Sequence, residues 1–265
     1  MPDYARFSMV LARQEGRLLT LTLNRPQALN ALSDAMQAEL LELIELVRTD
    51  DSIGAILLRG EGRAFCVGGD VKEMGQSTSP PAARVEEIFN SKKLLYSLLE
   101  VGPPIVCAVH GYAMGLGATL ALFSDIVIAA TDAVFADNHV EVGLVAGDGG
   151  AVLWPLLLPL GEAKYYLLTG DRSSGAEAAR RGMVHKAVPA DQVLDEATAL
   201  ARRLAAGATM ALKWTKTAVN QVLRERLRLV LDIGLALEGA TFLSEDHREA
   251  TTAFSARRDP VFRGR

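Results

Sequence analysis

PPIVCAVHGYAMGLGATLALFSDIVIAA, residues 103–130, is the stretch that decides the fold. It predicts a buried strand over Ile105–Val109, a glycine-rich loop, a short apolar helix beginning near Leu116, and a second buried strand over Ile126–Ala130. Both strands are unbroken apolar runs, as expected where both faces of a sheet are covered. Glycines allow close backbone approach, and the free N–H groups at a helix start favour negative charge. The stretch predicts an anion or oxyanion site, or else a tight turn that binds no ligand.

The order of strand, glycine-rich loop and helix occurs a second time, earlier in the chain. AILL at 55–58 reads as a short buried strand, and GEGRAFCVGGDV at 60–71 follows it. Sequential units of this kind tend to lie beside one another. We therefore expect the two loops to present backbone N–H groups to one point.

The apolar periodicity predicts the elements on either side. A hairpin of Phe7–Ala12 and Arg17–Leu23 opens the chain, and Ser33 is expected to cap a helix that ends near Arg48. A polar stretch, Gln76–Pro81, is expected to be mobile and to precede a helix over Ala83–Leu99. From residue 191 the chain is predicted to be almost wholly helical, over 193–205, 210–223, 227–243 and 246–256. Strands followed by helices predict α/β stacking with a separate helical end.

An apolar stripe on the predicted 227–243 helix leaves two interpretations open. Leu231, Leu235 and Leu237 dock on a second subunit, or they pack on the chain's own core.

The composition excludes several classes of protein. The 265 residues, 49% of them apolar, suit one large domain or a core with a smaller C-terminal part. A net charge of −4 without a cluster of basic residues argues against a nucleic-acid partner. The two cysteines, Cys66 and Cys107, exclude a disulfide framework. We see no secretory signal and no membrane-spanning run, so we expect a cytoplasmic protein. Dinucleotide, P-loop and zinc motifs are lacking, and we expect no metal site.

Several strings, in this order, closely resemble the enoyl-CoA hydratase/isomerase (crotonase) superfamily. They are NRPQALNAL at 24–32, RAFCVGGDV at 63–71, HGYAMGLGATLALFSDIVIA at 110–129, GLVAGDGG at 143–150, LLTGDRSSGAEAARRGMVHKAV at 167–188 and SEDHREATTAFSARRDPVFRGR at 244–265. The resemblance implies an α/β, crotonase-like spiral of repeated ββα units over residues 1–190. It also implies a C-terminal helical region over 191–265 that forms trimers, or hexamers as dimers of trimers.

The resemblance further implies a coenzyme A thioester as substrate, so coenzyme A is part of the substrate and we expect no separate cofactor. In this family the thioester oxygen lies between two backbone N–H groups, which map to Gly69 and Leu116. A thioester enolate develops charge on that oxygen, and one such donor typically contributes about 3–4 kcal/mol. Leu116 stands where the family usually has glycine. Only its N–H is needed, while its side chain reshapes the acyl pocket.

For coenzyme A itself, the resemblance implies contacts from the main chain of Ala28 and Val67. Val71 is expected to border the same cleft, and Lys72 to lie near the phosphates. Arg257 falls where the family often has a basic residue that approaches the 3′-phosphate from a neighbouring subunit. The alternative for Lys72 and Arg257, and for Arg25, is an ordinary solvated surface charge.

The sequence departs from the pattern of true hydratases at both of their glutamates. Those positions are Thr119 and His139 here. His139 titrates near neutrality and suits acid–base chemistry, unless it is a hydrogen-bonded structural histidine. Asp148 lies close to where isomerase relatives place a catalytic acid, although it also resembles a helix N-cap. Glu141 points to solvent or cleft and reads as structural, and Thr119 is a poor base.

We therefore expect an acyl-CoA enzyme that stabilises a thioester enolate, with His139 and Asp148 converging on the acyl pocket. Asp148 acts as the base, or orients His139 and holds it protonated. Family naming favours a hydratase, whereas loss of both glutamates favours an isomerase, a decarboxylase or a thioester hydrolase. A catalytically weakened acyl-CoA-binding protein is the alternative from another class.

Overall fold

The computed structural model describes residues 4–76 and 81–265; most of the stretch expected to be mobile, residues 77–80, lies outside them. The strands are β1 (Val10–Glu15), β2 (Leu18–Leu23), β3 (Ala55–Gly60), β4 (Ile105–Val109), β5 (Tyr112–Met114), β6 (Ile126–Ala130), β7 (Val134–Ala136), β8 (Ser173–Ser174) and β9 (Lys186–Val188). The helices are α1 (Asp34–Arg48), α2 (Val71–Gln76), α3 (Pro81–Glu100), α4 (Leu116–Phe123), α5 (Gly150–Leu157), α6 (Leu160–Thr169), α7 (Gly175–Arg180), α8 (Val193–Ala205), α9 (Thr209–Phe242) and α10 (Glu245–Ala256). Short 3₁₀ turns are η1 (Tyr4–Arg6), η2 (Pro26–Ala28), η3 (His139–Val142) and η4 (Ala190–Gln192).

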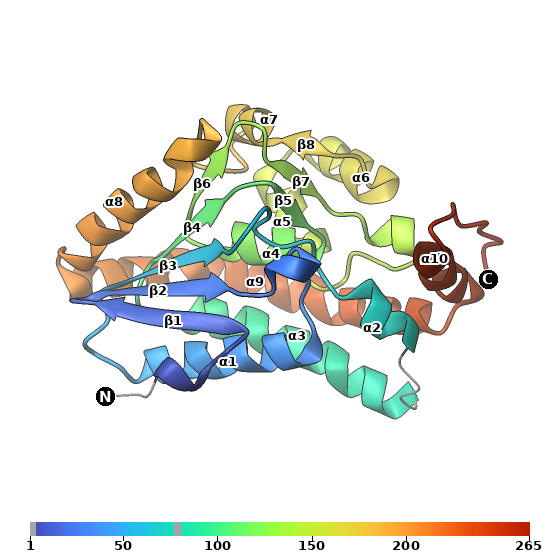
Figure 1. The fold of residues 1–265 in the computed structure, drawn as a ribbon, viewed down its shortest axis with the longest axis horizontal. Helices are drawn as coiled ribbons and strands as arrows, with labels where there is room; N and C mark the ends of the chain where they lie inside the picture. Colours follow the sequence, from blue (N-terminus) through green and yellow to red (C-terminus); the bar gives the residue numbers. More distant parts are fainter. Residues whose placement is uncertain (1–3, 77–80) are drawn as a thin grey trace.

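The main sheet has the strand order β1-β2-β3-β4-β6-β9 in the described residues (Figure 1). The β1–β2 hairpin is antiparallel, and every later neighbour pairs in parallel. The predicted strands Ile105–Val109 and Ile126–Ala130 are confirmed with those bounds. A smaller sheet, β5-β7-β8, stands beside the main one. The mixed α/β architecture is that expected of a crotonase-like fold.

Helices cover the sheet and close one continuous core. α8 packs on β3, β4 and β6, while α1 packs on α3, and α3 on α9. The predicted cap is confirmed, because the Ser33 hydroxyl accepts a hydrogen bond from the Met36 N–H at the start of α1. Figure 1 shows α9 running the length of the molecule, with α10 and α2 together at one end. The core includes side chains of α8 and α9, and the division of the chain near residue 190 stays a prediction.

One expectation for the helical part is wrong, and the structure decides between two interpretations that the sequence left open. The helices expected over 210–223 and 227–243 are one helix, α9, because Arg224, Glu225 and Arg226 between them are good helix formers and no breaker intervenes. Leu231 and Leu235, for which docking on a second subunit was one interpretation, are buried in the chain's own core. Leu237 is about half exposed.

The two glycine-rich loops lie against each other, as expected. A parallel bridge pairs Cys66 with Ala113, so the loop after β3 runs alongside β5, a strand that the sequence did not predict. A Cβ added to Gly117 would lie 2.4 Å from the Cys66 carbonyl oxygen, so only glycine allows this approach. The loop packing therefore places Gly69 and the start of α4 in one region.

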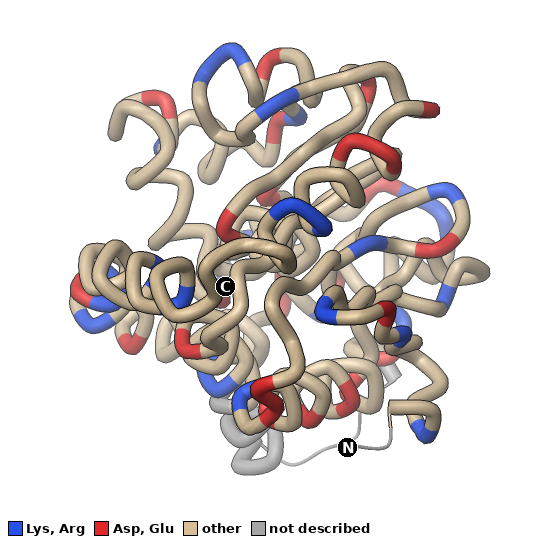
Figure 2. The backbone as a smooth tube through the Cα atoms, turned by 90° about the vertical axis from the view of Figure 1, so that its left-hand side faces the viewer, with Lys and Arg blue, Asp and Glu red and all other residues tan. Residues whose placement is uncertain are grey.

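Charged residues of both signs are interspersed along the described chain, and Figure 2 shows no region of a single sign on the side in view. No helix among the described residues is both long and apolar enough to cross a membrane.

Candidate active site

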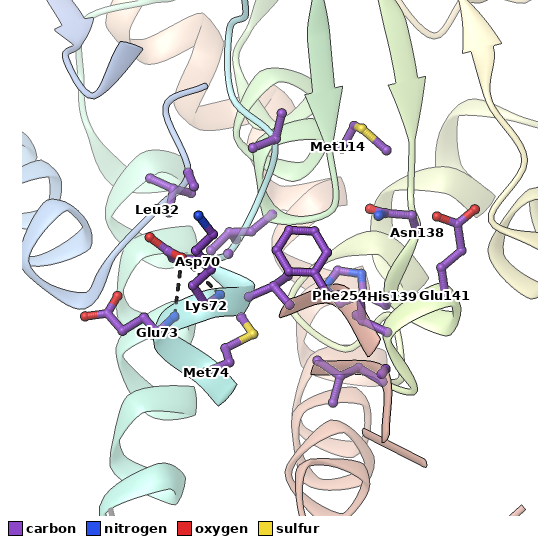
Figure 3. A pocket seen from close by; sticks show the side chains of 18 of the residues that line it. Leu32, Asp70, Lys72, Glu73, Met74, Met114, Asn138, His139, Glu141 and Phe254 are labelled. Carbon is purple, nitrogen blue, oxygen red and sulfur yellow. Dashed lines mark hydrogen bonds between the residues drawn. The ribbon is translucent and has the colours of Figure 1, made fainter. Parts of the chain in front are cut away.

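A cavity of about 1680 Å³ opens between the β2–α1 loop, α2, the segment after β7, and the C-terminal helices. Figure 3 shows Lys72, Glu73 and Met74 of α2 on one side, and Asn138, His139 and Glu141 on the other. The C-terminal residues Arg258, Asp259, Pro260 and Phe262 complete the wall beside α10. Gly69, Leu116, His139 and Asp148, predicted from the sequence as site residues, all line this cavity.

The Gly69 N–H faces away from its neighbouring strand segment. In the parallel bridge between Leu32 and Gly69, the Leu32 N–H donates to the Gly68 carbonyl and the Asp70 N–H donates to the Leu32 carbonyl. The bridge thus uses the groups on either side of Gly69 and leaves its own N–H directed elsewhere. This bridge therefore does not use the Gly69 N–H.

Leu116 is the first residue of α4, so its N–H has no partner within the helix. Gly115 caps the helix with φ +50°, a conformation that favours glycine. Gly68 is close by, since a Cβ added to it would lie 3.5 Å from the Leu116 nitrogen. The two loops and the α4 dipole together make a region suited to negative charge.

His139 begins η3 and is held between two carboxylates. Its Nδ1 lies 2.7 Å from Asp137 Oδ1, and its Nε2 lies 3.1 Å from Asp148 Oδ2. All three side chains are buried. Burial lowers the pKa of His139, but the charges of Asp148 and Asp137 and their hydrogen bonds outweigh it and hold the pKa well above its ordinary value. Both carboxylates therefore favour the protonated imidazole.

Asp148 is not a helix N-cap, contrary to one interpretation of the sequence. α5 begins at Gly150, its N-cap is Gly149, and no side chain caps it. The Asp148 carboxylate turns to His139 instead, because the imidazolium is the better partner for a buried negative charge. Gly150 leaves room for Asp137, since a Cβ at Gly150 would lie 1.8 Å from Asp137 Oδ2.

Glu238 of α9 joins this group and was missed from the sequence. It is 5% exposed, it lines the cavity, and its Oε2 has no hydrogen-bond partner among the described residues. Burial and the charge of Asp148 raise the pKa of Glu238 well above its ordinary value, Asp137 adds to this, and His139 opposes it. The signal was available, because Glu238 lies seven residues after Leu231 and so continues the buried stripe of α9. Asp137 was also missed, and its place two residues before His139 was the only hint.

One ligand atom each of His139, Asp148 and Glu238 lies within 4.8 Å of the other two, a spacing that would suit a metal ion. However, Nδ1 and Nε2 of His139 already face Asp137 and Asp148. That the site works without a metal stays a prediction.

Comparison with known proteins gives the family. Residues 13–265 match the family model for enoyl-CoA hydratase/isomerase. The chain belongs to the enoyl-CoA hydratase/isomerase family. The 1,2-epoxyphenylacetyl-CoA isomerase of Escherichia coli is 37% identical over 97% of this chain and 98% of its own. A probable mitochondrial enoyl-CoA hydratase of Dictyostelium discoideum is 33% identical over 98% and 92%. The crystal structure of an enoyl-CoA hydratase/isomerase from Mycobacterium paratuberculosis superposes with a TM-score of 0.88 at 35% identity, covering 94% of this chain and 99% of that one.

The two positions where the resemblance places hydratase glutamates, Thr119 and His139, differ in their place relative to the cavity. Thr119 is buried, lies outside the cavity lining, and its hydroxyl has no hydrogen-bond partner among the described residues. His139 does line the cavity. Glu141, predicted to be structural, lines the cavity too and pairs with Arg172 at 3.3 Å. Of these side chains, only His139 is both buried and placed at the cavity wall with charged partners.

Most of the residues expected to contact coenzyme A line the cavity, but Arg257 does not. Ala28, Val67, Val71 and Lys72 line the cavity. Arg257 does not, and it ends α10 in the left-handed conformation, φ 54°, with an exposed side chain. Its expected role, approach from a neighbouring subunit, stays a prediction.

Arg25, which the sequence left open as a solvated charge, also lines the cavity. Its Nη2 lies 3.0 Å from Asp70 Oδ2, and both side chains are mostly buried. That pair holds the β2–α1 loop against the loop that carries Gly69.

Proposed function

We propose that this member of the family is an acyl-CoA isomerase that moves a proton through a thioester enolate. The N–H groups of Gly69 and Leu116 hold the thioester oxygen, and the negative charge that develops there is stabilised by both donors and by the start of α4. The acid–base group is Asp148 with His139, in place of the usual pair of glutamates. The E. coli relative is named for the isomerisation of an epoxide and the Dictyostelium discoideum relative for a hydration, so the choice between the two reactions rests on the site.

The observation that carries the proposal is the hydrogen bond between His139 and Asp148 in the cavity wall, backed by Asp137. Moving a double bond requires a base that takes the α-proton and an acid that gives a proton to the γ-carbon. The Asp148 carboxylate, held in place by His139, is the base. The resemblance implies that hydratases manage the added water with a glutamate at the position of Thr119, and Thr119 is outside the cavity lining. Isomerisation therefore fits better than hydration.

The test is turnover on a panel of CoA thioesters that contains 2-enoyl, 3-enoyl, 3-hydroxyacyl and malonyl types. We expect the 3-enoyl thioester to be converted to the 2-enoyl form faster than any other member reacts. Faster hydration of the 2-enoyl thioester would make the protein a hydratase. Binding of the thioesters without turnover would make it an acyl-CoA-binding protein and would overturn the proposal.

A further inference from the structure

We infer that Glu238 is a second catalytic acid of this site, forming with Asp148 a carboxyl pair that holds one proton and delivers it to the acyl chain. This inference rests on the proposed function, and it assigns a chemical role to a residue of α9, outside the segments that carry the resemblance to hydratases. The pair would replace the two missing glutamates with carboxyls from other elements.

The geometry brings the two carboxyl groups together at the cavity wall. An oxygen of Asp148, an oxygen of Glu238 and a nitrogen of His139 lie within 4.8 Å of one another. Asp148 Oδ1 and Glu238 Oε2 are both buried without a hydrogen-bond partner among the described residues. Both residues line the cavity. Two buried acceptors without partners, both on residues that line one cavity, are a costly arrangement unless a proton or a ligand satisfies them.

The fold fixes this arrangement through a close crossing of two backbones. A Cβ added to Gly147 would lie 2.3 Å from the Gly234 carbonyl oxygen and 2.7 Å from Glu238 Oε2. The Val145 N–H donates a hydrogen bond of 3.2 Å to the Thr241 hydroxyl, one turn further along α9. Gly147 and Gly234, one on each of the two crossing segments, thus allow the Asp148 loop to pack directly on the turn of α9 that carries Glu238.

The charges around Glu238 favour a neutral carboxyl. Asp137 and Asp148 are negative and His139 is positive, so the group without Glu238 already carries a net negative charge. Two carboxylates with oxygens within 4.8 Å of each other repel in a buried site, which favours a proton on one of them. Burial and Asp148 both raise the pKa of Glu238 well above its ordinary value. Glu238 is the member that holds the proton in the resting site.

The pair accounts for every proton in the isomerisation of a 3-enoyl thioester. The Asp148 carboxylate removes the α-proton, and the electron pair of that C–H bond moves to give an enolate, held by the N–H groups of Gly69 and Leu116. The enolate then takes the Glu238 proton at the γ-carbon, so the Glu238 O–H breaks as a new C–H bond forms. The proton on Asp148 passes to Glu238, directly or through one water, and resets the site.

The test compares Glu238→Gln with wild type and with Glu225→Gln, the same change on the exposed side of α9. We expect Glu238→Gln to lower kcat on the 3-enoyl thioester roughly 10²-fold with little change in KM, and the control to keep wild-type values. Infrared spectroscopy at neutral pH should show the carbonyl band of a protonated buried carboxyl in wild type and lose it in Glu238→Gln. Wild-type protein carrying isotope-labelled glutamate should shift that band, which tests the assignment even if the variant does not fold.

The outcomes separate this inference from the proposed function. Wild-type turnover together with near-normal kcat in Glu238→Gln, or a band that is insensitive to labelled glutamate, would overturn the role of Glu238 alone. A wild-type protein that turns over no thioester of the panel would overturn the proposed function and this inference with it.

Discussion

Removing either side chain of the His139–Asp148 pair should abolish most of the catalytic activity, and removing both should lower kcat/KM little further. The 3.1 Å contact between them is a hydrogen bond between charged groups in a buried site. Such a bond contributes about 1.5–3 kcal/mol. In Asp148→Asn this support is lost and the pKa of His139 falls, although Asp137 remains at 2.7 Å.

The size of the effect follows from the two residues acting as a unit. We expect His139→Ala and Asp148→Asn each to lower kcat/KM by roughly 10²-fold, the usual scale for acid–base catalysis. A 10²-fold loss corresponds to about 2.7 kcal/mol of transition-state stabilisation. If the double variant also loses only about 10²-fold, the coupling energy between the two residues equals about 2.7 kcal/mol.

The assay is kcat/KM of the wild type, both single variants and the double variant on the best thioester of the panel, at several pH values. In wild type the rate should fall at high pH, with an apparent pKa above about 6.5, as the site loses the protons that His139 and Glu238 hold. Losses that multiply to about 10⁴-fold in the double variant would show that the residues act independently. Near-wild-type rates in both single variants would refute the assignment, and Glu141 would be the next candidate.

Three further outcomes are expected. Because the folded-state pKa of Glu238 is raised, the folded protein keeps a proton that the unfolded chain releases, so stability should fall as pH rises above about 4.5, by at most about 1.4 kcal/mol per pH unit for this group. Thermal unfolding of Glu238→Gln should lack that part of the pH dependence and give a higher Tm than wild type at neutral pH. An unchanged pH dependence would contradict the raised pKa. The chain should sediment as a trimer or hexamer, since Leu229, Ile233 and Leu237 leave an apolar stripe on α9 exposed by 64%, 59% and 51%, and a stable monomer at micromolar concentration would refute this. Exhaustive treatment with a chelator should leave turnover unchanged, whereas a loss restored by a divalent cation would mean that His139, Asp148 and Glu238 hold a metal.

The regular elements of the core were predictable because local patterns determine them. Ile105–Val109 and Ile126–Ala130 are unbroken apolar runs that fit only a strand covered on both faces, and α8 has the predicted bounds of Val193–Ala205. The division of α9 was wrong because three charged residues resemble a loop in sequence, while they are good helix formers.

The candidate site was predictable where the contributing residues lie close in sequence or in recognised motifs. Gly69, Leu116, His139 and Asp148 were named from the sequence, and they line one cavity. Glu238 is about ninety residues from Asp148 along the chain, and it reaches the site only through the crossing of Gly147 and Gly234. No local pattern encodes such a contact between distant segments. That Asp148 is not a helix cap likewise depends on a contact with His139 that only the three-dimensional structure shows.

The central claim, that two backbone N–H groups stabilise a thioester enolate, is tested most directly by solvent exchange of the α-protons. A saturated acyl-CoA thioester incubated with the protein in D₂O would be followed by proton NMR. Wild type should exchange the α-protons, Leu116→Ala should keep most of that rate because its N–H remains, and folded Gly69→Pro should lose it because proline has no N–H. Exchange by Gly69→Pro at the wild-type rate would contradict the account.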